Sequence, residues 1–382
     1  MRTYDVAIIG GGIIGLSIGF ELAAKNLRVI VLDRQEPGRE ASWAAAGMLS
    51  PAPDSPRDLP LVPFANESLR LYPQFVEEIE QASGKSAAYA RAGALEVFFG
   101  ENGAHECELR LRELQQLRIA AHVVGTNEAR AMQPEIGESV SAVLHLPEEG
   151  MVEPRALMDA LLTAARRRGV EIRAGSPVSR FVHEGTRCTG VMAGNDGISA
   201  SNVILAAGCF SGEIAAKDSF KQLAPTRPVR GQMIALRPSN RAGELRRVVR
   251  SERGYLVPRR DGRIVAGSTS EEAGFEKQVT AAGLRKILGA SLEMCPALGH
   301  AEVVEMWSGL RPGTPDDLPI LGPTGTAGLW IATGHYRNGI LLAAATAKLF
   351  GAWITGAVPP LDVDRFSPLR FGRREASAQQ VG

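Results

Sequence analysis

The beginning of the chain carries the feature that most constrains its fold. An apolar run, 4–9 (YDVAII), leads directly into residues 10–15 (GGGIIG), which form a G-x-G-x-x-G motif. A segment with helical character, 16–25, follows, and a second apolar run, 28–33, ends in an acid, Asp33. A strand, a glycine turn, a helix, a second strand and a carboxylate in this order are typical of a dinucleotide-binding unit.

Each part of this motif has a physical reason. Gly10 allows the tight turn, Gly12 lets backbone N–H groups approach a pyrophosphate, and Gly15 lets the helix pack closely on the strand. The helix directs its positive end toward the phosphates, and the Asp33 carboxylate can accept hydrogen bonds from a ribose diol. The alternative is a glycine-rich turn without a ligand, but the complete context favours the dinucleotide site.

Length and composition limit the classes of protein to consider. The 382 residues predict two domains, or three. With 45% hydrophobic and 22% charged residues, the chain is typical of a soluble globular protein. Because the net charge is +1, we expect neither nucleic acid nor a membrane surface as a partner. Arg246, Arg247, Arg250 and Arg253 form a local basic cluster, which we interpret as a solvated face.

The four cysteines form no metal or redox pair motif, because Cys107, Cys188, Cys209 and Cys295 are far apart in the sequence. We therefore expect reduced structural thiols, no metal site and a cytoplasmic protein. The first strand begins so early that it leaves no room for a signal peptide. The longest apolar stretch, 339–354, contains a lysine and is short for a membrane span, so we expect a buried helix there.

Helix and strand patterns recur along the chain. We expect a helix over 152–168 and strands over 93–99, 142–146, 170–173, 201–208, 229–236, 254–258, 263–268 and 329–333. This order predicts an α/β fold with a discontinuous Rossmann-like domain and a second, α+β domain whose sheet is mixed or antiparallel. We place the first domain at 1–87, 149–222 and 301–370, the second at 88–148 and 223–300, and a disordered tail at 371–382.

Several separated segments point to one family. Besides the N-terminal motif they are 44–49 (AAAGML), 203–208 (VILAAG), 254–259 (GYLVPR), 307–314 (WSGLRPGT) and 334–342 (GHYRNGILL). On these segments the chain resembles the FAD-dependent amine oxidases of the D-amino acid oxidase family, and within it the glycine oxidases of the thiamin pathway. The resemblance spans residues 5–370, and the last two segments are the most specific for the glycine oxidases.

The resemblance implies non-covalent FAD, bound by the Rossmann-like domain. The sarcosine oxidase branch has a cysteine that bonds to the flavin, whereas the only cysteine after residue 209 here, Cys295, lies outside any matching motif. The residues that we expect to bind FAD are Gly10, Gly12, Ile13, Ile14, Gly15, Asp33, Arg34, Ala41, Ser42, Ala46, Gly47, Met48, Val178, Gly208, His335, Tyr336, Arg337, Asn338, Gly339, Ile340 and Leu341.

Two of these segments are expected next to the flavin ring. Residues 44–48 are small, and Gly47 can adopt a positive φ, so backbone groups can reach the ring edge there. Residues 335–341 join a strand to a helix, whose first N–H groups can stabilise negative charge on the reduced flavin. The alternatives are a tightly packed turn and an ordinary strand-to-helix connection.

Arg311 is the residue that we expect to bind the substrate. Its planar guanidinium can hold a carboxylate through two parallel hydrogen bonds, which fixes the substrate Cα–H against the flavin N5. By resemblance, the Tyr255 hydroxyl reaches the same carboxylate, and Arg337 lies near the substrate and the ring, where its backbone can matter more than its side chain. The alternatives are a surface or ion-paired arginine at 311 and an ordinary core tyrosine at 255.

Two places depart from the glycine oxidase pattern. Ser270 stands where a bulkier side chain is expected, and residues 252–254, just before Tyr255, also differ. Both can border the pocket, so the size of the substrate stays open.

The resemblance implies a reaction as well as a cofactor. It is the oxidative deamination of glycine, other small primary or secondary amines or D-amino acids to an α-keto acid (glyoxylate from glycine), ammonia and hydrogen peroxide, with O2 as acceptor. The imine can also supply thiamin thiazole synthesis, and a homo-oligomer, a tetramer by resemblance, is expected. The alternatives are a D-amino acid dehydrogenase that reduces a quinone and a non-catalytic FAD subunit with a partner chain. The N-terminal motif alone would also fit an NAD enzyme, but the segment 334–342 favours FAD.

Overall fold

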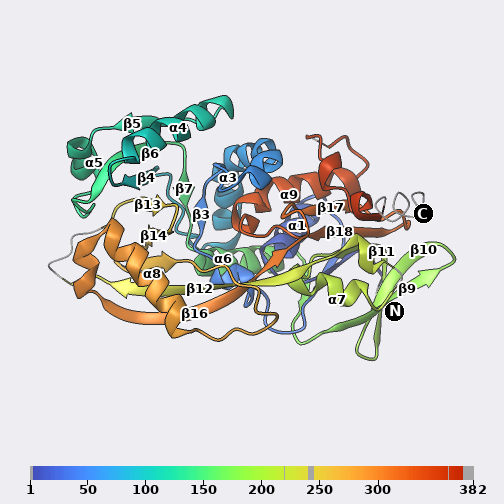
Figure 1. Cartoon of the computed structure of the whole chain (residues 1–382). Helices are drawn as coiled ribbons and strands as arrows, with labels where there is room; N and C mark the ends of the chain where they lie inside the picture. The colour runs from blue at the N-terminus through green and yellow to red at the C-terminus, as the bar shows by residue number, and fades with distance from the viewer. Residues whose placement is uncertain (1–2, 219, 240–244, 360, 373–382) are drawn as a thin grey trace, which may run out of the picture.

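The protein consists of two regions that lie side by side, each built around one large sheet (Figure 1). The computed structural model describes the chain over four ranges: 3–218, 220–239, 245–359 and 361–372. The expected tail at 371–382 lies outside these ranges except for Phe371 and Gly372, which are helical.

The first sheet is mostly parallel. Its eight strands in the described ranges are β1 (Thr3–Ile9), β2 (Val29–Leu32), β8 (Glu171–Arg173), β9 (Val178–Glu184), β10 (Arg187–Ala193), β11 (Asp196–Leu205), β17 (Ile320–Pro323) and β18 (Leu329–Thr333). The main order is β17-β18-β11-β1-β2-β8, with β17 antiparallel and the other five parallel. β9 and β10 form an antiparallel hairpin beside β11.

The central strand β1 is buried on both faces, which explains its unbroken apolar sequence. Val6 and Ile8 belong to one core, whereas Ala7 and Ile9 belong to the core on the opposite face. The first core includes the long helices α1 (Ile13–Ala24), α3 (Val62–Ser83), α6 (Pro154–Arg167) and α9 (Gly339–Ile354).

Helix α9 is buried along most of its length, as the apolar stretch at 339–354 predicts. Within the four described ranges, no helix combines the length and the apolar character that a membrane crossing requires.

The second sheet is mixed. Its described strands are β4 (Ala94–Phe99), β5 (His122–Val124), β6 (Val140–Leu146), β12 (Arg227–Arg237), β13 (Val248–Ser251), β14 (Gly254–Pro258), β15 (Ile264–Gly267) and β16 (Glu302–Gly313). They follow the order β16-β12-β15-β14-β13-β4-β6-β5, in which β13 and β4 are parallel and the other neighbours are antiparallel. The helices of this region are α4 (Gly103–Gln116), α5 (Thr126–Met132) and α8 (Ala281–Met294).

Short elements complete the description. They are α2 (Ala41–Ala44), α7 (Ser211–Ala215), the paired strands β3 (Met48–Leu49) and β7 (Gly150–Met151), and the 3-10 turns Pro56–Leu61, Gly208–Phe210, Lys221–Leu223, Pro296–His300 and Asp364–Phe366.

The predicted fold class is confirmed: a Rossmann-like α/β region is joined to a region with a mixed sheet. The division into domains stays a prediction, and its boundary at 301 does not follow the hydrogen bonding. β16 pairs with β12 along its whole length, so we would place the boundary after Gly313. Within the described ranges β16 is an edge strand that pairs only with β12, and a proline such as Pro312 is tolerated in an edge strand.

Candidate active site

A cavity of about 1380 Å³ is lined by residues of both regions. It extends from the glycine turn after β1 to the ends of β14, β15 and β16 in the second sheet. Pockets for small ligands are typically about 300–1,000 Å³, so this one has room for more than a small substrate.

Almost all of the predicted site residues line this cavity. The exceptions are Gly15 and Leu341. Gly15 packs inside α1 so closely on the turn that an added Cβ would lie 1.9 Å from the Gly10 oxygen. Leu341 is buried in α9, where its carbonyl accepts a hydrogen bond from the Ser68 hydroxyl at 2.6 Å. Neither residue is among those that line the cavity.

The glycine turn has the shape of a phosphate cradle. Gly10 has a φ of +109°, and an added Cβ would lie 2.4 Å from the Ala206 oxygen. Gly12 is the N-cap residue of α1 and provides no side-chain hydrogen bond to the helix. An added Cβ at Gly12 would meet only the Ser42 hydroxyl, at 3.3 Å. The Ser42 hydroxyl also accepts the Ile13 N–H at 2.9 Å. Gly10 is therefore required by the turn itself, whereas Gly12 leaves open space that a pyrophosphate can occupy.

Asp33 lies at the end of β2, next to this turn. Its two carboxylate oxygens accept hydrogen bonds from Gly11 N–H, at 2.7 Å, and Gln35 N–H, at 3.0 Å. Burial raises the pKa of this carboxyl, although both backbone contacts oppose the shift. Each oxygen retains a lone pair, so the group can still accept hydrogen bonds from a ribose.

Arg34 closes this end of the cavity with its side chain. Its guanidinium stacks on the Phe210 ring, 3.5 Å from the centroid, and donates to Glu40 at 2.8 Å. Lys277, from the second region, also pairs with Glu40. Contacts from both regions therefore hold the wall next to Asp33.

The segment 44–48 is held by its packing and its backbone. Gly47 has the expected positive φ, +81°, and an added Cβ would lie 2.0 Å from the Val152 oxygen. Arg259 donates to the Ala46 oxygen at 2.7 Å, and the Trp307 indole donates to the Ala44 oxygen at 3.0 Å. This wall of the cavity is therefore tightly packed, and its backbone is held in place by hydrogen bonds.

The connection from β18 to α9 forms another wall. Tyr336 has a φ of +47°, and its N–H donates to the Pro312 oxygen at 3.2 Å. His335 is buried, its Nε2 lies 3.2 Å from the Thr346 hydroxyl, and burial lowers its pKa to about 3. The imidazole is therefore neutral at neutral pH, so positive potential at this helix start comes from backbone N–H groups and from Arg337.

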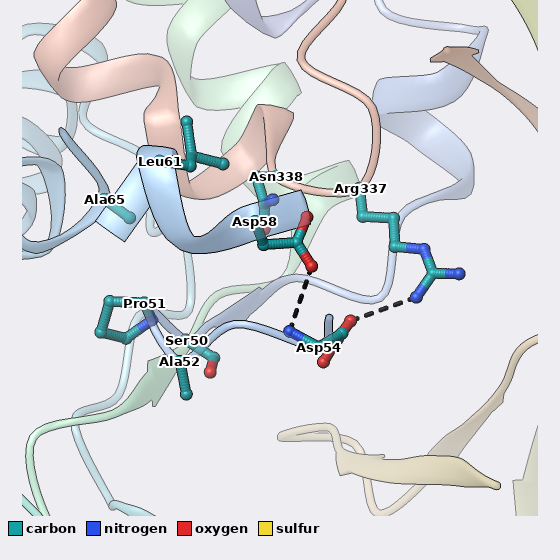
Figure 2. A pocket seen from close by; sticks show the side chains of 9 residues that line it. All are labelled: Ser50, Pro51, Ala52, Asp54, Asp58, Leu61, Ala65, Arg337 and Asn338. Carbon is teal, nitrogen blue, oxygen red and sulfur yellow. Dashed lines mark hydrogen bonds and ion pairs between the residues drawn. The ribbon is translucent and has the colours of Figure 1, made fainter. Parts of the chain in front are cut away.

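Arg337 reaches a smaller pocket that shares part of its lining with the large cavity (Figure 2). Its Nη1 donates to Asp54 at 3.2 Å, and the Asp54 N–H donates to Asp58 at 3.2 Å. Burial alone would lower the pKa of Arg337, but Tyr336 and Asp54 raise it. The Arg337 side chain thus has a carboxylate partner of its own.

Arg311 and Tyr255 meet at the second-sheet end of the cavity. Arg311 donates from Nη1 to the Thr269 oxygen at 3.0 Å and from Nη2 to the Ser268 hydroxyl at 2.7 Å. Burial lowers the pKa of Arg311, and the neighbouring Tyr255 opposes that shift. The Tyr255 hydroxyl donates to the Met233 sulfur at 3.3 Å. Ser268, Thr269 and Met233 were not predicted from the sequence, because only the fold brings them to Arg311.

The interpretation of 246–253 as a solvated face is wrong for Arg250. This side chain is buried and donates to Glu96 at 2.8 Å and to Glu149 at 2.9 Å. Arg110 also binds Glu96, at 3.1 Å, and the two arginines hold the pKa of Glu96 below its usual value although burial alone would raise it. Burial raises the pKa of Glu149. A charge at position 250 can stay buried because these acids approach it from distant segments.

The cysteines are buried and unpaired, as predicted. Cys209 lines the cavity, and burial raises its pKa to about 12, so it is a thiol and not a nucleophilic thiolate. Cys295 belongs to the core of the second sheet.

The glycine cradle, the acid after β2 and the cavity volume together define a dinucleotide site and fit FAD. The chain matches the family of FAD-dependent oxidoreductases, described as "DAO: FAD dependent oxidoreductase", over residues 5–353. It therefore belongs to this family and uses FAD.

Within the family, the chain is similar to glycine oxidases. It is 34% identical to the glycine oxidase of Pseudomonas putida over 95% of this chain and 98% of the relative. The structure of glycine oxidase from Geobacillus kaustophilus superposes with a TM-score of 0.90 at 30% identity, covering 97% of this chain and 99% of that one. The bifunctional protein ThiO/ThiG of Synechocystis is 37% identical over 97% of this chain, which spans about half of that longer protein, 54%.

Proposed function

We propose that this protein oxidises glycine and other small amines, with FAD as its cofactor and O2 as acceptor. The balanced reaction takes glycine, O2 and water to glyoxylate, ammonia and hydrogen peroxide. When bound, FAD supplies the acceptor for the hydride that leaves the substrate Cα. The similarity to glycine oxidases along nearly the whole chain supports this proposal.

Arg311 is the observation that carries the proposal. A guanidinium has five N–H donors, and the contacts with Ser268 and Thr269 use two of them. The remaining donors can bind a carboxylate at the edge of the cavity. A carboxylate held there fixes the orientation of the attached Cα, which is the main contribution that the protein makes to such a reaction.

Tyr255 can assist without a large rearrangement. Its hydroxyl donates to the sulfur of Met233, which is a weak acceptor, so a carboxylate oxygen is a better partner for it. Tyr255 and Arg311 would then bind the same carboxylate from two strands of the second sheet.

The proposed reaction needs the neutral amine and no dedicated general base. His335 is poorly suited to that role, because burial lowers its pKa to about 3 and its Nε2 already faces Thr346. The pH dependence of the reaction would then follow deprotonation of the substrate amine.

We also propose that the imine intermediate can supply thiazole synthesis for thiamin, as the name of the ThiO/ThiG relative suggests. A cytoplasmic location is part of the same proposal, since buried reduced cysteines suit a reducing compartment. The proposal also includes a homo-oligomer, which rests only on the resemblance to the glycine oxidases.

The test is hydrogen peroxide release by the purified yellow protein in air, with glycine as the only substrate. Equal amounts of peroxide and glyoxylate would support the proposal. Bleaching of the flavin by glycine under nitrogen, without peroxide in air, would instead indicate a dehydrogenase that uses another acceptor such as a quinone. Absence of bleaching would exclude glycine, and D-amino acids and N-methylglycine would then be tested.

A further inference from the structure

The Arg311 side chain crosses a neighbouring strand to reach its partners. Arg311 is on β16, and its guanidinium contacts Ser268 and Thr269, which follow the end of β15. In the sheet, β12 lies between β16 and β15. The side chain must therefore pass over β12.

The residue of β12 beneath the guanidinium is Gly231. In the strand register Gly231 is opposite Gly309, and Arg311 is opposite Val229, so Gly231 and Arg311 are diagonal neighbours on one face of the sheet. A Cβ at position 231 would lie 2.3 Å from Nη1, 2.4 Å from Nη2 and 2.5 Å from Cζ of Arg311. Any side chain at 231 would force the guanidinium out of this position.

The residues on either side of Gly231 fix the segment that receives Arg311. The Gln232 N–H donates to the Thr269 hydroxyl at 2.9 Å, and the Gln232 amide donates to Glu271 at 2.7 Å. Arg230 exchanges two backbone hydrogen bonds with Glu271, at 2.9 and 3.0 Å, and its Nε donates to the Glu271 carboxylate at 2.8 Å. The segment 268–271 is thereby attached to β12 on both sides of the glycine.

We propose that Gly231 is a positioning residue for substrate binding. It provides the space through which Arg311 reaches Ser268 and Thr269, while Arg230 and Gln232 hold these acceptors in place. This assignment rests on the proposed function, in which Arg311 binds the substrate carboxylate. In this assignment Gly231 acts only through Arg311. No contact between Gly231 and the substrate is required.

The first experiment compares Gly231→Ala with the wild type, both loaded with FAD, by titration with glycolate and detection of the flavin absorbance change. Glycolate carries the carboxylate of glycine and cannot be deaminated. We expect Gly231→Ala to retain FAD and to bind glycolate at least about tenfold more weakly, because the charge-assisted hydrogen bonds of Arg311 are displaced. The KM for glycine should rise accordingly.

Gly125→Ala is the matched control. Gly125 is an exposed residue at the start of α5, its φ is −63°, and a Cβ there would meet no atom within 4 Å. It is not one of the residues that line the cavity. The same change of one methyl group should leave glycolate affinity within about twofold of the wild type.

A double variant separates positioning from a general structural defect. In an Arg311→Ala background no guanidinium is left to displace, so adding Gly231→Ala should weaken glycolate binding by less than about twofold. The background also removes the steric conflict, so this comparison stays possible if Gly231→Ala alone fails to fold.

The outcomes are distinct. Wild-type affinity in Gly231→Ala, or an equal loss in the presence and absence of Arg311, would overturn the assignment and leave the proposed function intact. A wild-type protein that binds no carboxylate at all would overturn both.

Discussion

The two regions contribute to the cavity in different ways. The first sheet presents a glycine turn and Asp33 that come from one continuous stretch, residues 10–33. The second sheet presents Gly231, Tyr255 and Arg311, which stand on three strands and are separated by as many as 80 positions in the numbering, 231 to 311. One half of the site is local in the sequence, and the other is assembled by strand pairing.

This difference has a physical consequence for each half. In the local half, the conformation of the turn requires Gly10, whatever lies in the cavity. In the assembled half, the requirement for a small residue at 231 arises from a side chain on another strand. Substitutions in the first half should act on folding or cofactor binding, and substitutions in the second should act on substrate binding or on the junction between strands.

The largest effect on stability is expected at the buried arginine of the assembled half. Arg250→Ala leaves the Glu96 and Glu149 carboxylates without their main partner, which should lower the free energy of unfolding by about 3–5 kcal/mol. Arg253→Ala is the control, because this neighbour is 56% exposed and pairs with Glu293 at the surface; about 0–1 kcal/mol is expected. Urea unfolding measures both, and equal losses would show that Arg250 behaves as a surface charge.

Substrate binding should depend most strongly on Arg311. Arg311→Ala removes the guanidinium from the cavity, and we expect kcat/KM for glycine to fall about 100-fold or more, corresponding to a loss of about 3 kcal/mol. An amine without a carboxylate serves as the control substrate, and its kcat/KM should change little. A similar fall for both substrates would mean that Arg311 supports the fold of the site and does not bind the carboxylate.

The sequence was sufficient for the local half of the molecule. The β1–α1–β2 unit was predicted because apolar runs, glycines and a terminal acid lie next to one another. The short strands expected at 254–258 and 263–268 are present as β14 and β15. The buried helix at 339–354 was predicted from its apolar composition alone.

The assembled half could be predicted only in part. Arg311 and Tyr255 were found through family motifs, but Gly231, Ser268 and the burial of Arg250 were not. Each depends on contacts between distant segments: Gly231 with Arg311, Ser268 with Arg311, and Arg250 with Glu96 and Glu149. The periodicity of apolar residues in a sequence indicates which face of a helix or strand a residue occupies, but not which distant residue it contacts.

Two glycines of the local half should separate folding from cofactor binding. Gly10→Ala forces a Cβ to within 2.4 Å of the Ala206 oxygen at a positive φ, so the apoprotein should lose about 1–3 kcal/mol of unfolding free energy. In Gly12→Ala the nearest atom is the Ser42 hydroxyl at 3.3 Å, so the apoprotein should lose less than about 1 kcal/mol while FAD binding weakens about tenfold. Thermal unfolding of the apoproteins and FAD titration test this contrast. Equal destabilisation of the apoprotein by both substitutions would contradict it.

A pH-dependent effect is expected at a residue that returns to the nucleotide site from the far end of the chain. Burial lowers the pKa of His335 to about 3, whereas an unfolded histidine titrates near about 6.5. Between these values the unfolded state binds a proton that the folded state does not, so stability is unaffected above about pH 6.5 and falls as the pH decreases, by about 2 kcal/mol at pH 5. His335→Gln removes the group that takes up this proton on unfolding. The unfolding free energy of the variant should therefore fall less between pH 7.5 and pH 5 than that of the wild type. His105→Gln, at an exposed position of α4, should follow the wild type. Parallel pH profiles for all three proteins would mean that His335 can accept a proton in the folded state, and the imidazole could then contribute positive charge at the start of α9.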